Sequence, residues 1–408
     1  MNPTFRLDNR TLGLILSGRA AEAGLESFSA GEWEALSKRA QAEGVGPLLY
    51  WALSRSGSGS SIPEPARDFL RLTCAATRIR NQALFAGLAG LLPLFRRAGI
   101  PVVLLKGACY ALTIYPDPGL RPMGDVDLLL PRLKLAEAAR IARSQGFVDA
   151  APEAAPGLRD LLNHEVCLRR AGPQPVTLEL HHSLVADRTF TYAVPVDWFW
   201  QQTEALKSSR AGFGRVLILT PTAQALYAAA HAMLQHGGET APLRWFHDLD
   251  LLIRHYRGRL DWELLLAQAR KFEWGSALEA ALAQTAACFD TPVPEGVLAA
   301  LAASPDRHRE LVAMKQARPE THLLLEGRKL LSLNGYGRLR LALALAFPSP
   351  AYMRWRYHLD NPWALPLWYA LRWWGIFKDA LRTLAVLAHK VRPASRDPLF
   401  LPGKTKNL

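Results

Sequence analysis

Apolar residues recur at helical spacing over residues 65–97 and then give way to a short continuous apolar run. The helical stretch ends at Ala98-Gly99. Its apolar positions include Leu70, Cys74, Leu84, Leu88, Leu91 and Leu94. The next segment, Ile100–Leu105, is apolar at nearly every position, which is typical of a buried strand. A helix is expected to follow at once, from about Gly107 to Ile114, so the pattern predicts a sharp strand-to-helix corner.

A second apolar run, Asp125–Leu130, alternates in a way that separates acidic from apolar side chains. Asp125 and Asp127 are two positions apart, so in a strand their carboxylates project from one face while the valine and leucines between them fill the other. Burying two like charges side by side near a core costs on the order of several kcal/mol of folding free energy, unless a cation, a proton or an arginine compensates them. A divalent metal is the simplest compensation.

A third acidic residue lies on a predicted β-hairpin further along the chain. Residues 164–169 and 176–181 are two short strands separated by a Gly/Pro-containing turn. In the second strand Glu179 and His181 point away from the side that carries the leucines. If this strand lies beside the Asp-containing strand, Glu179 joins Asp125 and Asp127, and three carboxylates predict a Mg²⁺ (or Mn²⁺) site for phosphoryl or nucleotidyl transfer. His181 is interpreted as a neighbour of the ligands or of a nucleotide.

The corner at Lys106-Gly107-Ala108 is a candidate phosphate site. Glycine lets the backbone approach a ligand closely, and the free N–H groups of the first helical turn attract anions. Arg121, in the turn-rich loop before the acidic strand, is expected either to keep the carboxylates ionised or to bind phosphate through both nitrogens. The competing interpretations are an ordinary tight turn at Gly107, a solvated Lys106 and a surface ion pair at Arg121.

The remaining chain is predicted to be helical, apart from a Ser/Gly-rich linker at Ser54–Ser61. The fold class is therefore α+β, a small mixed sheet with helices on one face plus a helical bundle. We expect four parts, namely an N-terminal helical cap (1–80), a catalytic domain (81–215), a helical domain (216–330) and a Trp-rich helical extension (331–408). Within the helical domain, His231 and Asp248 are expected to form a buried pair that joins two helices.

The net charge of +13 and the pI near 9.8 favour an anionic partner, such as a nucleotide, a nucleic acid or a membrane surface. Because no run of five or more basic residues occurs, a dedicated nucleic-acid arm is not favoured. Residues Trp363–Lys390 combine tryptophans with basic residues and resemble an amphipathic helix, which could dock onto the bundle or contact a membrane peripherally.

The four cysteines are far apart and show no C-x-x-C spacing, so they are expected to be core thiols in a reducing compartment. The pair His181-His182 has no zinc-ligand spacing to His164 or Glu165, and no zinc site is expected. The first residues lack the pattern of a signal peptide. The expected location is the cytoplasm, with peripheral contact to the inner membrane face as an addition.

The order Leu-Lys-Gly-Ala, Pro-Gly-Leu-Arg-Pro, Asp-x-Asp and then a strand with an acid and a histidine resembles the uncharacterised nucleotidyltransferases of the polymerase-beta-like superfamily. The resemblance implies the fold of that catalytic core. It also implies that Gly107 lies near a triphosphate and that Asp125, Asp127 and Glu179 bind two metal ions. Ala108 departs from the usual Ser or Gly, and the spacing from Gly107 to Asp125 is longer than usual. Weaker similarity extends from about Asn81 to Arg372 and includes His231 and Asp248.

The predicted function is metal-dependent transfer of a nucleoside monophosphate from an NTP, such as ATP, to a hydroxyl of an unknown small molecule or protein. A catalytically silent nucleotide-binding or scaffolding module, associated with a membrane pathway, is the alternative. A nucleic-acid acceptor is a weaker third interpretation, which a steep salt dependence of oligonucleotide binding would support.

Overall fold

A computed structural model describes residues 9–56, 62–185, 194–207, 213, 215–236, 238, 241–316 and 322–391. The chain forms two compact units, Met1–Ala317 and Arg318–Leu408. The finer division into four parts stays a prediction. The linker predicted at Ser54–Ser61 falls largely outside the described residues.

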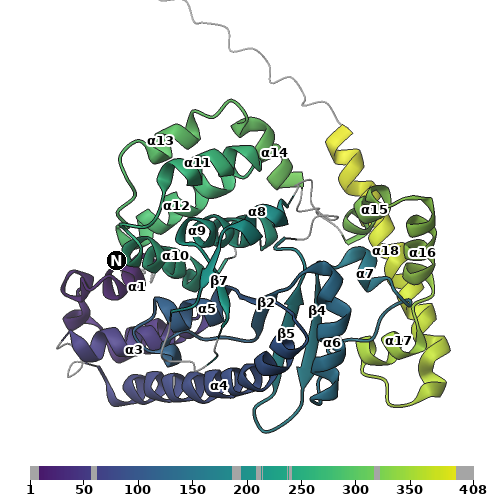
Figure 1. Cartoon of the computed structure of the whole chain (residues 1–408), viewed down its shortest axis with the longest axis horizontal. Coiled ribbons are helices and arrows are strands. Elements are labelled where there is room, and N and C mark those ends of the chain that lie inside the picture. The colour runs from purple at the N-terminus through teal and green to yellow at the C-terminus, as the bar shows by residue number, and fades with distance from the viewer. Residues whose placement is uncertain are drawn as a thin grey trace, which may run out of the picture. The chain divides into compact units, whose positions relative to one another are not determined.

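A mixed β-sheet lies at the centre of the first unit (Figure 1). In the described part of the chain it has seven strands in the order β3-β4-β5-β2-β1-β7-β6. The strands are β1 (Val103–Leu104), β2 (Val126–Leu129), β3 (Val148–Asp149), β4 (Glu165–Arg170), β5 (Val176–His181), β6 (Thr203–Ala205) and β7 (Leu217–Leu219). Strand β2 is parallel to β5 and antiparallel to β1, whereas β4 and β5 form the antiparallel hairpin that the sequence predicts. The α+β class with a mixed sheet is therefore confirmed.

Helices cover both faces of this sheet, and the expectation of helices on one face only is wrong. On one face, leucines of β2 and β5 pack in a single core with α4 (Glu64–Arg97) and α6 (Leu135–Ser144). On the other face, Val103 and Leu129 belong to a second core shared with α8 (Val196–Gln201) and α9 (Pro221–Ala230). Two-sided coverage follows from the sequence of β1 and β2, where consecutive residues are apolar and both faces need partners.

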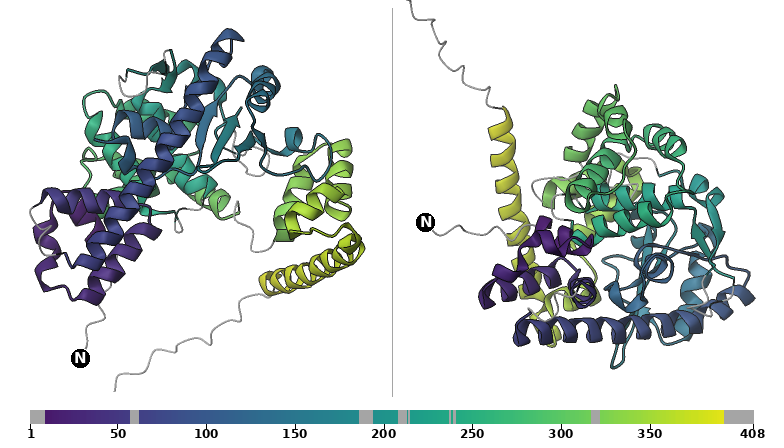
Figure 2. Two further views of the ribbon diagram at one scale, coloured as in Figure 1. Left: turned by 90° about the horizontal axis from the view of Figure 1, so that it is seen from below. Right: turned by 90° about the vertical axis from the view of Figure 1, so that its left-hand side faces the viewer.

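Helix α4 runs along the sheet side of the first unit and is its longest element (Figures 1 and 2). It has 34 residues, and one stripe of it is buried against the sheet and the N-terminal helices. The shorter helices and turns of the N-terminal half are α1 (Asn9–Leu16), η1 (Ala20–Ala23), η2 (Leu25–Ser27), α2 (Ala30–Ala42), α3 (Gly46–Arg55), α5 (Lys106–Thr113), η4 (Pro118–Leu120), η5 (Arg132–Lys134) and α7 (Arg159–Leu162). The long helix and the strand-to-helix corner predicted from periodicity are both present.

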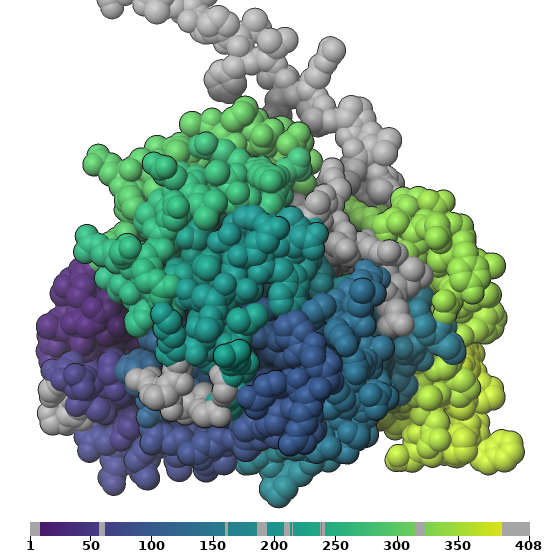
Figure 3. Space-filling view, viewed as in Figure 1, coloured from purple at the N-terminus to yellow at the C-terminus, as the bar shows by residue number. Residues whose placement is uncertain are grey.

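A helical bundle completes the first unit, as expected after Thr220. Its elements beyond α9 are the π-helix η6 (His231–Gln235), α10 (Leu243–His255), α11 (Trp262–Lys271), α12 (Gly275–Phe289), α13 (Val297–Ala302) and α14 (Arg307–Gln316). Helix α1 packs on α12, where Ser17 donates to the carbonyl of Phe289, so the N-terminal helices and the bundle form one continuous surface (Figure 3).

The second unit consists of helices only, within the described residues. They are α15 (His322–Ser332), α16 (Gly335–Ala346), α17 (Pro350–Tyr357), the short turn η7 (Pro362–Ala364) and α18 (Leu365–Val391). Helix α18 packs on α15 and α17. The main-chain N–H of Leu323 donates to Asp379 at 2.8 Å, which fixes the start of α15 against α18. Among the described helices we find none with the length and apolarity needed to cross a membrane.

Candidate active site

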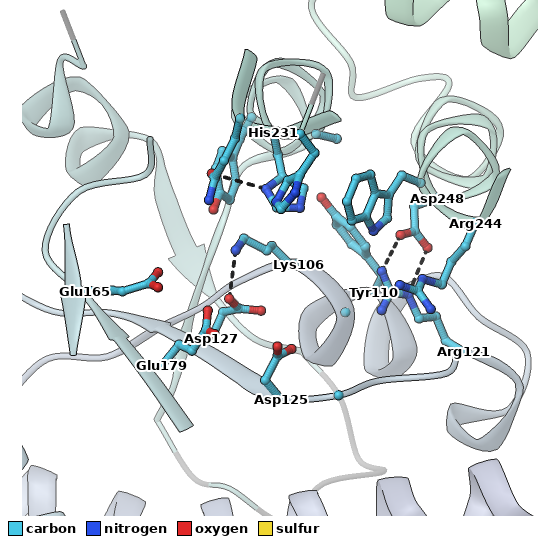
Figure 4. A pocket seen from close by; sticks show the side chains of 17 residues that line it. Lys106, Tyr110, Arg121, Asp125, Asp127, Glu165, Glu179, His231, Arg244 and Asp248 are labelled. Carbon is cyan, nitrogen blue, oxygen red and sulfur yellow. Dashed lines mark hydrogen bonds and ion pairs between the residues drawn. The ribbon is translucent and has the colours of Figure 1, made fainter. Parts of the chain in front are cut away.

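A pocket of about 320 Å³ opens in the first unit between the sheet and the helices η6 and α10. Acidic residues from β2, β4 and β5 form one wall, whereas arginines and aromatic rings form the other (Figure 4). Its lining consists of Lys106, Gly107, Tyr110, Arg121, Gly124, Asp125, Asp127, Glu165, Glu179, Tyr227, Ala228, His231, Gln235, His236, Arg244, Trp245 and Asp248.

The acidic wall is set by strand register. Asp127 and Glu179 are directly paired across the parallel strands β2 and β5, so their side chains leave the sheet on the same face. Asp125, two residues before Asp127, lines the same wall (Figure 4). The three predicted carboxylates are thus brought to one pocket. Glu165, on β4, adds a fourth acid that the sequence interpretation did not select, although its alternation with Val166 resembles that of Glu179.

Lys106 occupies the corner between β1 and α5 and reaches back to the acidic wall. Its Nζ lies 2.8 Å from Asp127 Oδ1, and both side chains are largely buried. The backbone of Lys106 has φ of 45°, a left-handed conformation that costs a non-glycine residue about 1–3 kcal/mol and is concentrated at functional sites. The lysine is therefore a fixed buried cation and not a solvated side chain.

The carboxylates of the acidic wall have pKa values that are shifted in opposite directions. Burial opposes ionisation of Asp127, but Lys106 and the hydrogen-bonded His181 outweigh it and hold the Asp127 pKa well below its usual range. For Asp125, burial and repulsion from Asp127 and Glu179 raise the pKa to about 6. Asp125 makes no hydrogen bond or ion pair with the described residues. Lys106 therefore does not compensate all the negative charge of Asp125, Asp127 and Glu179, and the remaining charge favours binding of a cation.

His181 lies between the acids of β2, β4 and β5. Its Nε2 is 3.0 Å from Asp127 Oδ1 and 3.4 Å from Glu179 Oε2, and its Nδ1 is 3.3 Å from Glu165 Oε2. The ring is fully buried. Burial and Lys106 act against its protonation, but the hydrogen bonds to Asp127 and Glu179 raise its pKa to about 9. The expected position of His181, beside the candidate ligands, agrees with this geometry.

Arg121 lies on the opposite wall and pairs with a residue that the sequence did not suggest. Its guanidinium binds Asp248 of α10, with Nη2–Oδ2 at 2.6 Å and Nε–Oδ1 at 3.3 Å, and it lines the pocket without pairing with Asp125 or Asp127. The surface ion pair considered for Arg121 is wrong, because both side chains are buried. The expected His231–Asp248 pair is also wrong, since Asp248 binds Arg121 and Tyr115 while His231 faces Gln235 at 3.4 Å.

Gly107 is required by Arg121. A Cβ added to Gly107 would overlap Nη1 of Arg121, so the arginine lies directly on the backbone of the first α5 turn. The glycine therefore allows a close approach, as the sequence predicts, and in the described structure the approaching group is a guanidinium. The next residue, Ala108, is buried and does not contribute to the pocket lining.

Arg244 is a further cation of this wall, and the sequence interpretation missed it. Its Nε is buried and has no hydrogen-bond partner among the described residues. Burial and the neighbouring Arg121 lower its pKa. Glu43 holds the start of α10 by accepting from the Leu243 N–H at 2.6 Å, and Gly44 leaves the space that the Arg244 guanidinium fills. Arg244 offers donors to the pocket, and only tertiary structure could have identified it.

Three rings form an aromatic cluster beside Arg244. His231 lies 4.5 Å from His236 and 4.8 Å from Trp245, measured between ring centroids, and His236 lies 4.7 Å from Trp245. His231 and His236 belong to or follow the π-helix η6, an irregularity often found at functional sites. Burial keeps the pKa of His231 well below its ordinary value, so the ring is a neutral, planar surface.

The pocket thus combines clustered strand carboxylates with the cations Lys106, Arg121 and Arg244, a set of groups suited to a divalent cation and a polyphosphate. A family model described as "Uncharacterised nucleotidyltransferase" matches residues 29–290, and the chain belongs to this family. The resemblance inferred from the sequence is therefore confirmed. The match includes the whole sheet and the bundle up to α12.

Among solved structures, the chain is similar to an antigenic nucleotidyltransferase-like protein from Paracoccidioides brasiliensis. The identity is 16%, the match covers 48% of this chain and 92% of that chain, and the TM-score is 0.30. A TM-score this low supports no conclusion about the fold or the site. A comparison with curated proteins gives no match.

Proposed function

We propose that this protein is a metal-dependent nucleotidyltransferase with a polymerase-beta-like core. The acceptor hydroxyl gives its proton to water and its oxygen attacks the α-phosphorus of an NTP. The bond from that phosphorus to the oxygen it shares with the β-phosphate breaks, and pyrophosphate leaves with that oxygen. The observation that carries the proposal is the parallel pairing of Asp127 with Glu179, which gathers the acids of a nucleotidyltransferase-family chain into one pocket. The acceptor is proposed to be a small molecule or a protein.

Asp125, Asp127 and Glu179 are proposed to hold Mg²⁺ or Mn²⁺. Their donor atoms are hard carboxylate oxygens, and one oxygen of Asp127 and one of Glu179 lie within 4.8 Å of each other. Asp125 has no partner among the described residues, and its raised pKa indicates uncompensated charge around it. When bound, the metal supplies positive charge for the phosphate oxygens and lowers the pKa of the acceptor hydroxyl.

The cationic residues are proposed to bind the triphosphate. Lys106 is kept charged by Asp127, and Arg121 is kept charged and oriented by Asp248. Arg244 has a donor left over for a ligand oxygen. The amide of Gly107, in the first turn of α5, would add a neutral donor at a positive helix end.

The aromatic cluster of His231, His236 and Trp245 is proposed to contact the nucleobase. Every base has a flat face that can stack on such rings, with a contribution of about 1–3 kcal/mol per base. The carboxylates and the cluster lie on opposite walls of one pocket, which is the arrangement needed to bind the two ends of a nucleotide (Figure 4).

The test is transfer of label from each of four α-labelled NTPs, with Mg²⁺ or Mn²⁺, into cell-extract acceptors. Glu179→Gln removes one acid while leaving the Lys106–Asp127 pair in place, and Asp127→Asn removes the central acid. Both should lose transfer. Asp149→Asn is the control, because Asp149 lies on β3 of the same sheet and does not line the pocket. Transfer that survives in Asp127→Asn, or that is absent from the native chain with every NTP, contradicts the proposal.

A catalytically silent module with peripheral membrane contact is the second candidate, and the exposed residues of η7 and α18 favour it. Within the second unit, Trp363, Trp374 and Phe377 are 89%, 57% and 51% exposed. Lys378 and Arg382 are exposed on the same helix as Trp374 and Phe377, a combination that suits an anionic lipid surface. This candidate predicts NTP binding without turnover and sedimentation with anionic liposomes. Sedimentation should fall in Trp373→Ala/Trp374→Ala, and an unchanged bound fraction would rule out this contact.

A further inference from the structure

The register of the β4–β5 hairpin brings together three residues whose sequence spacing suggests no common site. Glu165 is directly opposite His181, and His164 immediately precedes β4. Glu165 Oε2 lies 3.2 Å from His164 Nε2 and 3.3 Å from His181 Nδ1. The three potential donor atoms are all within 4.8 Å of one another. Two imidazole nitrogens and one carboxylate oxygen therefore converge on one point at the end of the hairpin.

Both ring nitrogens that face this point lack a hydrogen bond. His164 Nε2 and His181 Nδ1 are buried, and neither has a hydrogen-bond partner among the described residues. His181 is fully buried, and the side chain of His164 is 11% exposed. Buried polar atoms are almost always satisfied, so two adjacent unsatisfied nitrogens beside a carboxylate indicate a missing partner. A metal ion that binds Nδ1 of His181 displaces the proton that this nitrogen carries in the metal-free ring.

The distances of 3.2 and 3.3 Å from Glu165 to the two histidines match the ligand spacing around a small tetrahedral ion. Metal–ligand bonds of about 2.0–2.1 Å place the ligands of a tetrahedral Zn²⁺ site about 3.3–3.4 Å apart. We propose that His164, Glu165 and His181 bind one transition-metal ion of the Zn²⁺ type, separate from the proposed Mg²⁺ carboxylates. Two histidines and one glutamate leave a fourth position open to water or to a substrate atom. Imidazole ligands favour such a metal over Mg²⁺.

The same assignment explains the other face of the His181 ring. A histidine that binds a metal through Nδ1 carries its proton on Nε2, and this N–H commonly donates to a carboxylate. His181 Nε2 lies 3.0 Å from Asp127 Oδ1. The bound ion thus fixes the imidazole tautomer and, through it, the orientation of Asp127. This role does not depend on whether the pocket transfers nucleotides.

The test measures metal retained by the full-length chain without an affinity tag, after chelator treatment, incubation with Zn²⁺ in excess Mg²⁺, and desalting. Mass spectrometry of the metal should find about one equivalent of Zn²⁺ in the native chain. Co²⁺ in place of Zn²⁺ should give the intense visible absorption of a four-coordinate site, a readout that needs no variant.

His164→Gln and Glu165→Gln should each lose the retained ion. His182→Gln is the matched control, because His182 follows His181 but its ring contacts the carbonyl of Asn163. Circular dichroism and thermal unfolding of each variant show whether it is folded. Absence of retained Zn²⁺ from the native chain overturns the proposal, as does retention by folded His164→Gln with loss in Glu179→Gln. Calorimetry of Mg²⁺-dependent NTP binding on the same zinc-free protein reports separately on the proposed function.

Discussion

Arg121 and Asp248 form a buried two-point ion pair that joins the loop before β2 to helix α10. Their closest atoms, Nη2 and Oδ2, are 2.6 Å apart, and the hydroxyl of Tyr115 donates to Asp248 Oδ1 at 2.7 Å. The two residues are 127 positions apart in the chain. The pair therefore ties α10, which forms one wall of the pocket, to the loop that leads into β2, the strand that carries Asp127 of the acidic wall.

Loss of one member of this pair should destabilise the protein strongly. Arg121→Gln leaves the Asp248 carboxylate buried without a counter-charge, which typically costs about 3–5 kcal/mol of unfolding free energy. Arg78→Gln is the control, since it breaks the half-exposed pair between Arg78 of α4 and Asp117 of the same loop and should cost less than about 1 kcal/mol. Urea unfolding measures both. The double variant Arg121→Gln/Asp248→Asn should be more stable than Arg121→Gln, and equal losses in Arg121→Gln and Arg78→Gln would contradict the assigned role.

Gly107 should not tolerate alanine, although alanine is the better helix former. The new methyl group would overlap the Arg121 guanidinium and displace it from Asp248, so Gly107→Ala should lower both the unfolding free energy and the affinity for NTP. In Gly90→Ala, at an exposed position of α4 with open space around it, the same change should stabilise the protein by about 0.5–1 kcal/mol. Thermal unfolding and calorimetry compare the two variants. Gains of similar size in both would show that the close approach to Arg121 is not required.

The local pattern of the sequence was sufficient to predict three of the four acids of the acidic wall, and it missed Glu165. Alternation assigned Asp125, Asp127 and Glu179 to defined faces of two strands, and the parallel pairing of β2 with β5 then placed them together. Strands β6 and β7 were missed, because three residues are too short to show a period. β6 is an edge strand of the sheet and β7 is next to it, so their absence from the prediction did not change the predicted positions of the candidate residues.

The local sequence pattern could not predict contacts between elements that are far apart in the chain. The partner of Arg121 and the position of Arg244 depend on how α10 packs against the sheet, which periodicity does not encode. Likewise, no zinc site was expected, because the pair His181-His182 has no recognisable zinc-ligand spacing to His164 or Glu165. Ligand spacing rules describe sites built on one loop or helix, whereas here antiparallel register brings Glu165 opposite His181. A hairpin register written out residue by residue could have revealed this cluster.

Trp245 should recognise the base and not the phosphates. Trp245→Ala removes the largest ring of the aromatic cluster, so NTP affinity should fall about 5- to 150-fold, as expected from stacking of about 1–3 kcal/mol. Affinity for inorganic tripolyphosphate, which lacks a base, should not change. Trp51→Ala, on the surface of α3, is the control for loss of a tryptophan. Calorimetry with both ligands checks the prediction, and an equal loss for NTP and tripolyphosphate would place the ring near the phosphates.

His247 should make the stability of the first unit decrease in acid. The His247 ring is buried against Tyr115 and Phe289. Burial lowers its pKa, and Arg254 adds to this effect. The carboxylates of Asp250 and Asp248 act in the opposite direction but do not outweigh it. The folded chain therefore binds this proton less readily than the unfolded chain, whose histidine has a pKa of about 6.5. Stability contributed by the neutral ring is present above that pH and is lost as the pH falls below it, with a slope of up to about 1.4 kcal/mol per pH unit.

Urea unfolding of the native chain and of His247→Gln isolates the contribution of His247. The unfolding free energy is measured between pH 7.5 and pH 5, about the range over which a normal histidine titrates. Glutamine does not titrate, so the variant should lose less stability than the native chain as the pH falls, and the two curves should approach each other. His255→Gln, at an exposed position of the same helix, should keep the native pH dependence. Parallel curves for the native chain and His247→Gln would mean that other buried groups, among them His231, produce the acid sensitivity.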